Sequence, residues 1–353
     1  MAEQQFPWPA GAATGVGSMP GTDPVQACEV VFGQLPDLPY LPELPARGPG
    51  ADLTGRTAAL LVGLPVQVTS AGWKLTDRPG RDLTRAVGYW SRDLDTLEEV
   101  AAGYAGPLKI QVCGPWTLAA TLELSRSANP ALSDPGAVAD LTASLAEGVA
   151  AHAADVRKRV PGATIVVQLD EPFLPAALGG RIPTASGLAT VAPVDRIVAS
   201  QRLAAVLAAT SAPSVVHCCG RAAAAFDEIR AAGATAISFD LGQLPVRETD
   251  RIAELAEAGL GLLVGAVPTD VVARTPPRGA RGVAPPRTAR QTAEDVVAMW
   301  RRTGLPADQL PAHVVITPAC GLAGVAPAAA TAALRHCREA ARVAAEMIEE
   351  GSR

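Results

Sequence analysis

Short apolar runs alternate with longer helical patterns along most of the chain. The apolar runs are rich in Val, Ile and Leu, which is typical of strands buried on both faces. We expect strands at residues 14–17, 39–43, 108–113, 164–170, 214–219, 235–240, 261–266 and 313–317. We expect helices at residues 23–34, 82–103, 137–160, 191–210, 222–232, 247–258, 288–303 and 326–350. This alternation of about eight strands with helices predicts an α/β fold, a single TIM-like (β/α)8 barrel with inserted loops.

Two stretches do not fit a minimal barrel. Residues 48–80 and the Pro- and Arg-rich run 274–287 are long and lack a helical pattern. Loops of this length in compact domains are usually lids or binding loops. We expect the first to form a hairpin or cover, and either one could close over a substrate. No internal repeat or long linker divides the sequence, so we expect one catalytic barrel domain over residues 1–353, with its core at about 12–350.

Composition and charge narrow the class of protein. Hydrophobic residues make up 48% of the 353 positions and charged residues 18%, which is enough apolar material for a large core and argues against disorder. The net charge is -5 without a block of Lys or Arg, so we expect no nucleic-acid partner and no binding to an anionic membrane. The N-terminus has no basic start followed by an apolar stretch, and we expect a cytoplasmic protein.

A histidine and two cysteines end one predicted strand, in the run VVHCCG. Residues two apart on a strand face the same side, so His217 and Cys219 point together while Cys218 points away. Six cysteines are too few for a disulfide scaffold in a chain of this size, and clustered cysteines in a reducing compartment more often bind metals or act in catalysis. The pair therefore supplies half of a possible metal site.

Two further metal-binding groups follow other predicted strands. Cys320 lies just after the last strand, and Asp240 ends the strand that follows the VVHCCG run. Because all strands of a barrel end on one face, residues about a hundred positions apart can meet there. Any one of these residues alone would more often be a packing residue, and Asp240 could equally cap a turn. Together they predict a zinc site with the ligands His217, Cys219, Cys320 and Asp240.

Other strand ends carry groups suited to a substrate. In QLDEP, adjacent acids face opposite sides of a strand, so we expect Asp170 to enter the barrel mouth and Glu171 to cap or pair. Asp170 could then hold an ammonium group or relay a proton; the alternative is an acid at a helix N-terminus. The glycines around Gly17 and Ser18 permit close backbone approach to a ligand carboxylate. Trp116 could stack on a flat heterocycle or plug the barrel top.

Taken in order, the segments GVGSMPGTDP, CGPWTLA, QLDEP, HCC, SFD and TPACGL resemble the catalytic C-terminal barrel of the cobalamin-independent methionine synthase family. The resemblance spans roughly Gly15 to Leu322. It extends more weakly to uroporphyrinogen decarboxylase-like barrels and to zinc thiol methyltransferases that use corrinoid proteins. It implies zinc on the imidazole and thiols of HCC and CGL, with an acidic fourth ligand that is usually Glu in the family and here aligns with Asp240.

The same resemblance implies a reaction and a substrate site. A methyl group would pass from 5-methyltetrahydrofolate, in polyglutamate form, to the zinc-bound thiolate of homocysteine, giving methionine. The homocysteine carboxylate would meet Gly17 and Ser18, and its ammonium group would meet Asp170 and Glu43. Trp116 would lie in the loop that family members use close to the folate.

Two departures from the family pattern leave the methyl donor open. The synthases usually carry a second, N-terminal barrel that helps to hold the folate, and they place a histidine after the seventh strand, where this sequence has GAVPT. A corrinoid protein is therefore an alternative donor. A non-catalytic zinc protein is the alternative outside enzymes, whereas decarboxylation of a porphyrinogen is disfavoured because that chemistry has no use for the thiols.

Overall fold

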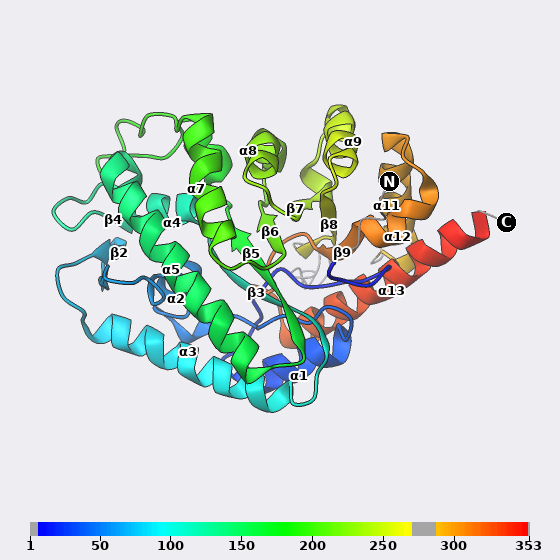
Figure 1. Ribbon diagram of the computed structural model, residues 1–353, viewed down its shortest axis with the longest axis horizontal. Helices are drawn as coiled ribbons and strands as arrows, with labels where there is room; N and C mark the ends of the chain where they lie inside the picture. The colour runs from blue at the N-terminus through cyan, green and yellow to red at the C-terminus, as the bar shows by residue number, and fades with distance from the viewer. Residues whose placement is uncertain (1–5, 270–286, 352–353) are drawn as a thin grey trace, which may run out of the picture.

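The computed structural model describes residues 6–269 and 287–351 of the chain. Its centre is a curled parallel sheet of six strands, and the long helices run along the outside (Figure 1). In spatial order the strands are β3 (Gly106–Cys113), β5 (Ala163–Asp170), β6 (Ser214–His217), β7 (Ala236–Asp240), β8 (Gly261–Val267) and β9 (Val314–Pro318). Each strand pairs in parallel with the next, so all six carboxyl ends share one face. The prediction of an α/β fold with a parallel sheet is confirmed.

The eight predicted helices are present with small shifts of their ends. They are α1 (Pro24–Gln34), α3 (Arg81–Val100), α5 (Pro135–Arg159), α7 (Arg196–Ala208), α8 (Phe226–Ala231), α9 (Thr249–Glu257), α11 (Ala289–Thr303) and α13 (Pro327–Gly351). Local chemistry sets their ends. The carboxylate of Asp134 accepts from two backbone amides at the start of α5, and Thr288 and Gln291 form a capping box before α11. Gly304 ends α11 in the left-handed conformation that glycine adopts most easily.

The first two predicted strands are not regular strands. Residues 14–17 are flanked by two isolated bridges, Ala13 with Ile316 and Ser18 with Glu43, and residues 39–43 take part in the second of these and in a bridge of Tyr40 with Lys109. Six of the eight predicted strands are thus confirmed, and irregular backbone spans the gap between β9 and β3. The physical reason lies in the sequence of these segments, because prolines lack the N–H that a ladder needs and glycines add no side chain to pack.

The stretch 48–80 contains a short helix and a hairpin. Helix α2 (Leu53–Ala58) precedes the antiparallel strands β1 (Val66–Thr69) and β2 (Gly72–Leu75), and β2 continues into a small sheet with β4 (Leu122–Glu123). The prediction of a hairpin here is confirmed. Of the run 274–287, all but Arg287 lies outside the described residues, so its role as a lid stays a prediction. Within the described part of the chain, every helix is too short or too polar to cross a membrane.

The interior of the curled sheet changes from apolar to polar along the strands. Outward residues such as Val167 pack with the helices, while inward residues such as Val166 form a separate cluster. Phe6 and Trp8, stacked at a centroid distance of 5.2 Å, belong to that cluster and close it beside the first residue of β8. Toward the carboxyl ends the buried side chains are Lys109, Gln111, Gln168, Asp170, His217 and Ser238. Polar groups therefore concentrate at the face where a barrel enzyme binds its substrate.

Candidate metal centre and its surroundings

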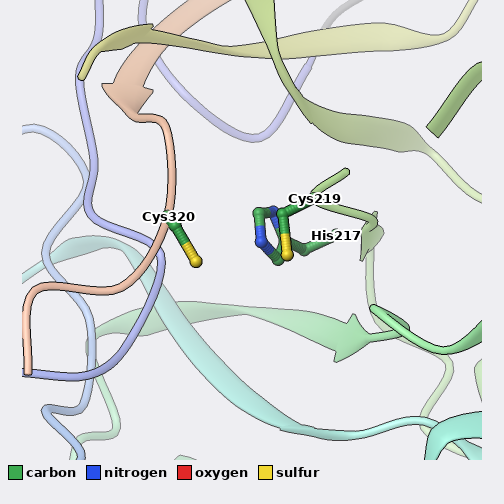
Figure 2. A group of neighbouring side chains, drawn as sticks. All are labelled: His217, Cys219 and Cys320. Atoms are coloured by element: carbon green, nitrogen blue, oxygen red, sulfur yellow. The ribbon is translucent and has the colours of Figure 1, made fainter. Parts of the chain in front are cut away.

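One imidazole and two thiols meet at the carboxyl ends of the strands. The ligand atoms of His217, Cys219 and Cys320 all lie within 4.8 Å of one another, and Figure 2 shows their side chains converging from two separate segments. His217 is the last residue of β6, and Cys320 lies two residues beyond β9. The structure therefore brings together three of the four predicted ligands, from positions about a hundred residues apart in sequence.

The histidine ring is held in a defined orientation. His217 is 3% exposed, and its Nδ1 lies 2.8 Å from the hydroxyl oxygen of Ser238 on the neighbouring strand β7. Its Nε2 is buried and has no hydrogen-bond partner among the described residues. A buried polar atom without a partner is unusual in a folded protein. The unpartnered nitrogen, next to two sulfurs, is the atom expected to bind a metal.

The two thiols share a proton. The hydrogen bond from Cys219, together with the nearby His217, lowers the pKa of Cys320 to about 4. The same contact with Cys320, followed by burial, raises the pKa of Cys219 well above its usual value. A metal binds cysteine as thiolate, so its arrival would displace the remaining proton. One imidazole with two thiolates is a donor set that suits zinc and leaves a position for a fourth ligand.

The fourth predicted ligand is engaged elsewhere. One carboxylate oxygen of Asp240 accepts from the backbone N–H of Gly242 at 2.8 Å, and the other accepts from the Gln243 amide at 2.7 Å. Asp240 thereby caps the 3-10 helix η4 (Leu241–Gln243), which is the alternative role that its sequence context left open. In this arrangement Asp240 stands outside the group of three, and its role as a metal ligand stays a prediction.

Two buried carboxylates lie near the metal centre. Asp170 ends β5 beside His217 of β6 and accepts from the Gln168 amide at 2.7 Å. Burial raises the pKa of Asp170 to about 7, against the opposing effect of His217. Glu43 is also buried; its carboxylate lies 3.5 Å from the guanidinium of Arg56, and burial raises its pKa. These are the two acids expected to meet an ammonium group.

The neighbouring acid and the tryptophan have structural roles. Glu171 accepts from the backbone amides of Trp116 and Thr117, and thereby caps helix α4 (Pro115–Thr121). The prediction that this acid caps or pairs while Asp170 faces the interior is confirmed. Trp116 is 1% exposed and its indole N–H donates to the Ala199 carbonyl at 3.0 Å. The structure thus gives Trp116 the packing role, the second of its two predicted alternatives, and its contact with a substrate stays a prediction.

The loop of Gly17 and Ser18 lies against the loop that carries Cys320. The carbonyl of Ser18 accepts from the backbone N–H of Leu322 at 2.9 Å, and a Cβ added to Gly321 would collide with the Ser18 hydroxyl. A Cβ at Gly17 would lie 2.9 Å from Gln111, so only glycine fits this approach. The predicted carboxylate-binding loop is therefore a direct neighbour of the loop that carries Cys320.

A cavity of about 870 Å³ opens beside the two thiols. Cys219 and Cys320 both line it, as does Asp240, together with residues that follow β7 and β8 and with the exposed side of α11. This volume is in the range of small-molecule sites. The thiols are thus reachable by a ligand, which a closed structural metal site would prevent.

Sequence reasoning missed several groups of this site. Ser238, Lys109 and Gln168 are buried polar residues within strands that the hydrophobic pattern assigned to the core. The available signal was the pattern itself, because a lysine and a glutamine interrupt the apolar run LKIQVC. A charged residue at an inward position of a buried strand indicates a polar partner inside the curled sheet.

Comparisons with known proteins agree with this geometry. The sequence model of a family described as "Cobalamin-independent synthase, Catalytic domain" matches residues 129–343. The structure is similar to that of a B12-independent methionine synthase from Shewanella sp. W3-18-1 in complex with selenomethionine, with a TM-score of 0.64, 11% identity, and coverage of 97% of this chain and 99% of that chain. It is also similar to a methyltransferase from Methanosarcina mazei, with a TM-score of 0.55, 14% identity, and coverage of 98% and 95%. At these identities the structures show a shared fold, and no curated protein sequence matches the chain.

Proposed function

Because the chain belongs to the family of cobalamin-independent synthase catalytic domains, we propose that it is a zinc-dependent enzyme that transfers the methyl group of 5-methyltetrahydrofolate to homocysteine, forming methionine. The observation that carries this proposal is the convergence of His217, Cys219 and Cys320 beside an open cavity. Two thiolates and an imidazole suit a metal whose task is to bind one more sulfur. Methyl transfer is the activity that the family implies, and homocysteine, folate and zinc are the finer parts of the proposal.

Three side chains of this protein would hold the zinc, and its contribution would be to bind the substrate thiol as a thiolate. A free thiol has a pKa of about 8.5, so only a few per cent is nucleophilic at pH 7. His217 contributes Nε2 while Ser238 occupies its other nitrogen. Asp240 is the candidate for a further acidic ligand, which would require it to leave the cap of η4.

The amino-acid part of homocysteine fits the polar interior. Asp170 and Glu43 offer two buried carboxylates to its ammonium group, and the loop of Gly17 and Ser18 offers backbone amides to its carboxylate. An arriving ammonium favours the ionised form of Asp170, whose pKa burial raises to about 7 in the free protein. Attack of the thiolate on a methyl group needs alignment more than acid–base catalysis, and these contacts supply the alignment.

The methyl donor would occupy the cavity of about 870 Å³ that exposes both cysteine sulfurs. A methylated folate is the donor that the family implies. One observation favours a methylated corrinoid protein as the second candidate: Trp116, which by the family resemblance would lie close to the folate, is buried and bonded to Ala199. We also propose that residues 13–18 and 40–43 take the places of the first two strands of a closed (β/α)8 barrel.

The decisive experiment combines metal analysis with turnover. The purified chain should contain about one zinc per molecule, and zinc X-ray absorption should show an additional sulfur when homocysteine is added. The loaded enzyme should then demethylate 5-methyltetrahydrofolate only when homocysteine is present. If homocysteine is methylated only when a methylated corrinoid protein is supplied in place of the folate, the donor assignment changes. Bound zinc whose ligands do not change with homocysteine would indicate a structural site and would overturn the proposal.

A further inference from the structure

Lysine 109 is a charged side chain in the core of the protein. It lies on β3, is fully buried, and its ammonium group donates to the carbonyl of Val16 at 2.8 Å. The amide of Gln168 on β5 donates to the same carbonyl, also at 2.8 Å. Burial lowers the pKa of Lys109 to about 8, while Asp170 and Glu43 favour its charged form. Burying an ammonium group is unfavourable unless hydrogen bonds and opposite charges compensate for it, as the Val16 carbonyl and the two carboxylates do here.

The two donors fix one peptide of the N-terminal segment. A trans peptide is planar, so the N–H of Gly17 points opposite to the carbonyl of Val16 and therefore away from Lys109 and Gln168. The carbonyl of Gly17 in turn accepts from the N–H of Glu43 at 3.1 Å, which directs the N–H of Ser18 away from Glu43. Within the described part of the chain, neither of these two amides donates a hydrogen bond.

Free amides of this kind form an anion site when a positive charge stands behind them. The N–H of Ser18 points away from the Glu43 segment, and the Ser18 carbonyl is bonded to Leu322, close to Cys320. Gln168 alone could satisfy the Val16 carbonyl, so hydrogen bonding does not explain why the second donor is a lysine. A buried cation next to this peptide does have an effect that glutamine lacks, because it adds positive potential at the two free amides.

We propose that Lys109 is a positioning residue for the carboxylate of an amino-acid thiol. This inference rests on the proposed function, in which the thiol binds the metal and the carboxylate meets Gly17 and Ser18. Lys109 acts through the Val16 carbonyl, which it holds inward, and through its charge, which favours an anion at the amides beyond. It selects thiols that carry a carboxylate over thiols that lack one.

The test compares two thiols on two proteins. Homocysteine and 3-aminopropane-1-thiol carry the same thiol and amine, but the second lacks the carboxylate. Binding of each to the cobalt-substituted full chain is titrated by the sulfur-to-cobalt absorption, in the wild type and in Lys109→Met. We expect the variant to bind homocysteine about 10- to 100-fold more weakly, the range for loss of a charged hydrogen-bonding group. We expect it to bind the aminothiol no more weakly than the wild type, because the aminothiol has no carboxylate to lose and its ammonium group gains from the removal of a cation near Asp170 and Glu43.

Controls separate this role from a loss of folding or of metal. Lys158→Met removes an exposed lysine of α5 and should change neither affinity. Lys109→Gln keeps a donor without the charge and should fall between the wild type and Lys109→Met, which also covers the case in which methionine prevents folding. Cobalt content and the melting temperature are measured for every variant.

The outcomes are distinct. If Lys109→Met lowers the affinities for both thiols equally, or changes neither affinity, the positioning role is overturned while the proposed function stays intact. Failure of the wild type to bind homocysteine through cobalt would overturn the proposed function and this inference with it.

Discussion

Replacing Ser238 by alanine tests how His217, the proposed metal ligand, is oriented. The Ser238 hydroxyl lies 2.8 Å from Nδ1 of His217, and the two side chains are 2% and 3% exposed. A neutral imidazole carries its proton on one nitrogen only. With that proton on Nδ1 and donated to Ser238, the bare Nε2 is ready for a metal. The alanine variant loses this preference and leaves Nδ1 without a partner in the core.

The expected effect can be worked from this contact. Removing the hydrogen-bond partner of a metal-binding histidine lowers metal affinity by about 10- to 100-fold, or about 1.4–2.7 kcal/mol. That range agrees with the cost of about 1–3 kcal/mol for leaving one buried polar group unsatisfied. The assay is a zinc titration of the full chain against a competing chelator at constant pH, because zinc affinity itself depends on pH.

A matched serine provides the control. Ser144 on α5 is 6% exposed, and its hydroxyl donates to the Val62 carbonyl at 2.9 Å, outside the metal centre. Ser144→Ala should lower the melting temperature to a similar degree and leave the zinc dissociation constant unchanged. A wild-type zinc affinity in Ser238→Ala, or an equal loss in Ser144→Ala, would refute the reasoning.

Three further predictions concern Cys320, Glu171 and Trp116. Cys320→Ser should reduce bound zinc to well below one per chain, because a hydroxyl is a poor substitute for a thiolate; retention of full zinc content would exclude Cys320 as a ligand. Burial raises the pKa of Glu171 to about 7, above its usual 4.5, so its contribution to stability is present at low pH and lost as the pH rises through 7. The free energy of unfolding of the metal-free chain should therefore fall by up to about 3 kcal/mol from this group between pH 4.5 and 8, and Glu171→Gln should flatten that slope. Trp116→Phe should lower the free energy of unfolding by about 1–3 kcal/mol in urea denaturation through loss of the bond to Ala199, with homocysteine affinity unchanged; a selective loss of folate turnover would instead return Trp116 to the substrate site.

The convergence of one histidine and two cysteines was predictable because it depends on a general property of parallel sheets, whereas Asp240 was predicted to join them and lies outside the group. His217 and Cys219 share a strand face by the two-residue period, and Cys320 joins them because parallel strands end on one side. Ser238 was beyond the reach of this reasoning. Ser238 can contact the His217 ring because the two residues lie opposite each other in the register of β6 and β7. A pattern of apolar positions does not specify register to the residue.

The sequence by itself determined eight of the helices, six of the strands and the order in which they follow one another, since these depend on local periodicity and on caps such as Asp134. It did not predict the short helices, such as α2 in the stretch 48–80. Only the tertiary structure decided how the Pro- and Gly-rich segments before residue 45 are held, and which of their backbone amides lack a hydrogen-bond acceptor within the described part of the chain. The carboxylate of Asp240 could bind a metal or cap the turn that follows it. The carbonyl of Val16 could accept from a backbone N–H of a neighbouring strand or from the side chain of Lys109. Such choices are decided by which partner lies within hydrogen-bonding distance once the chain has folded.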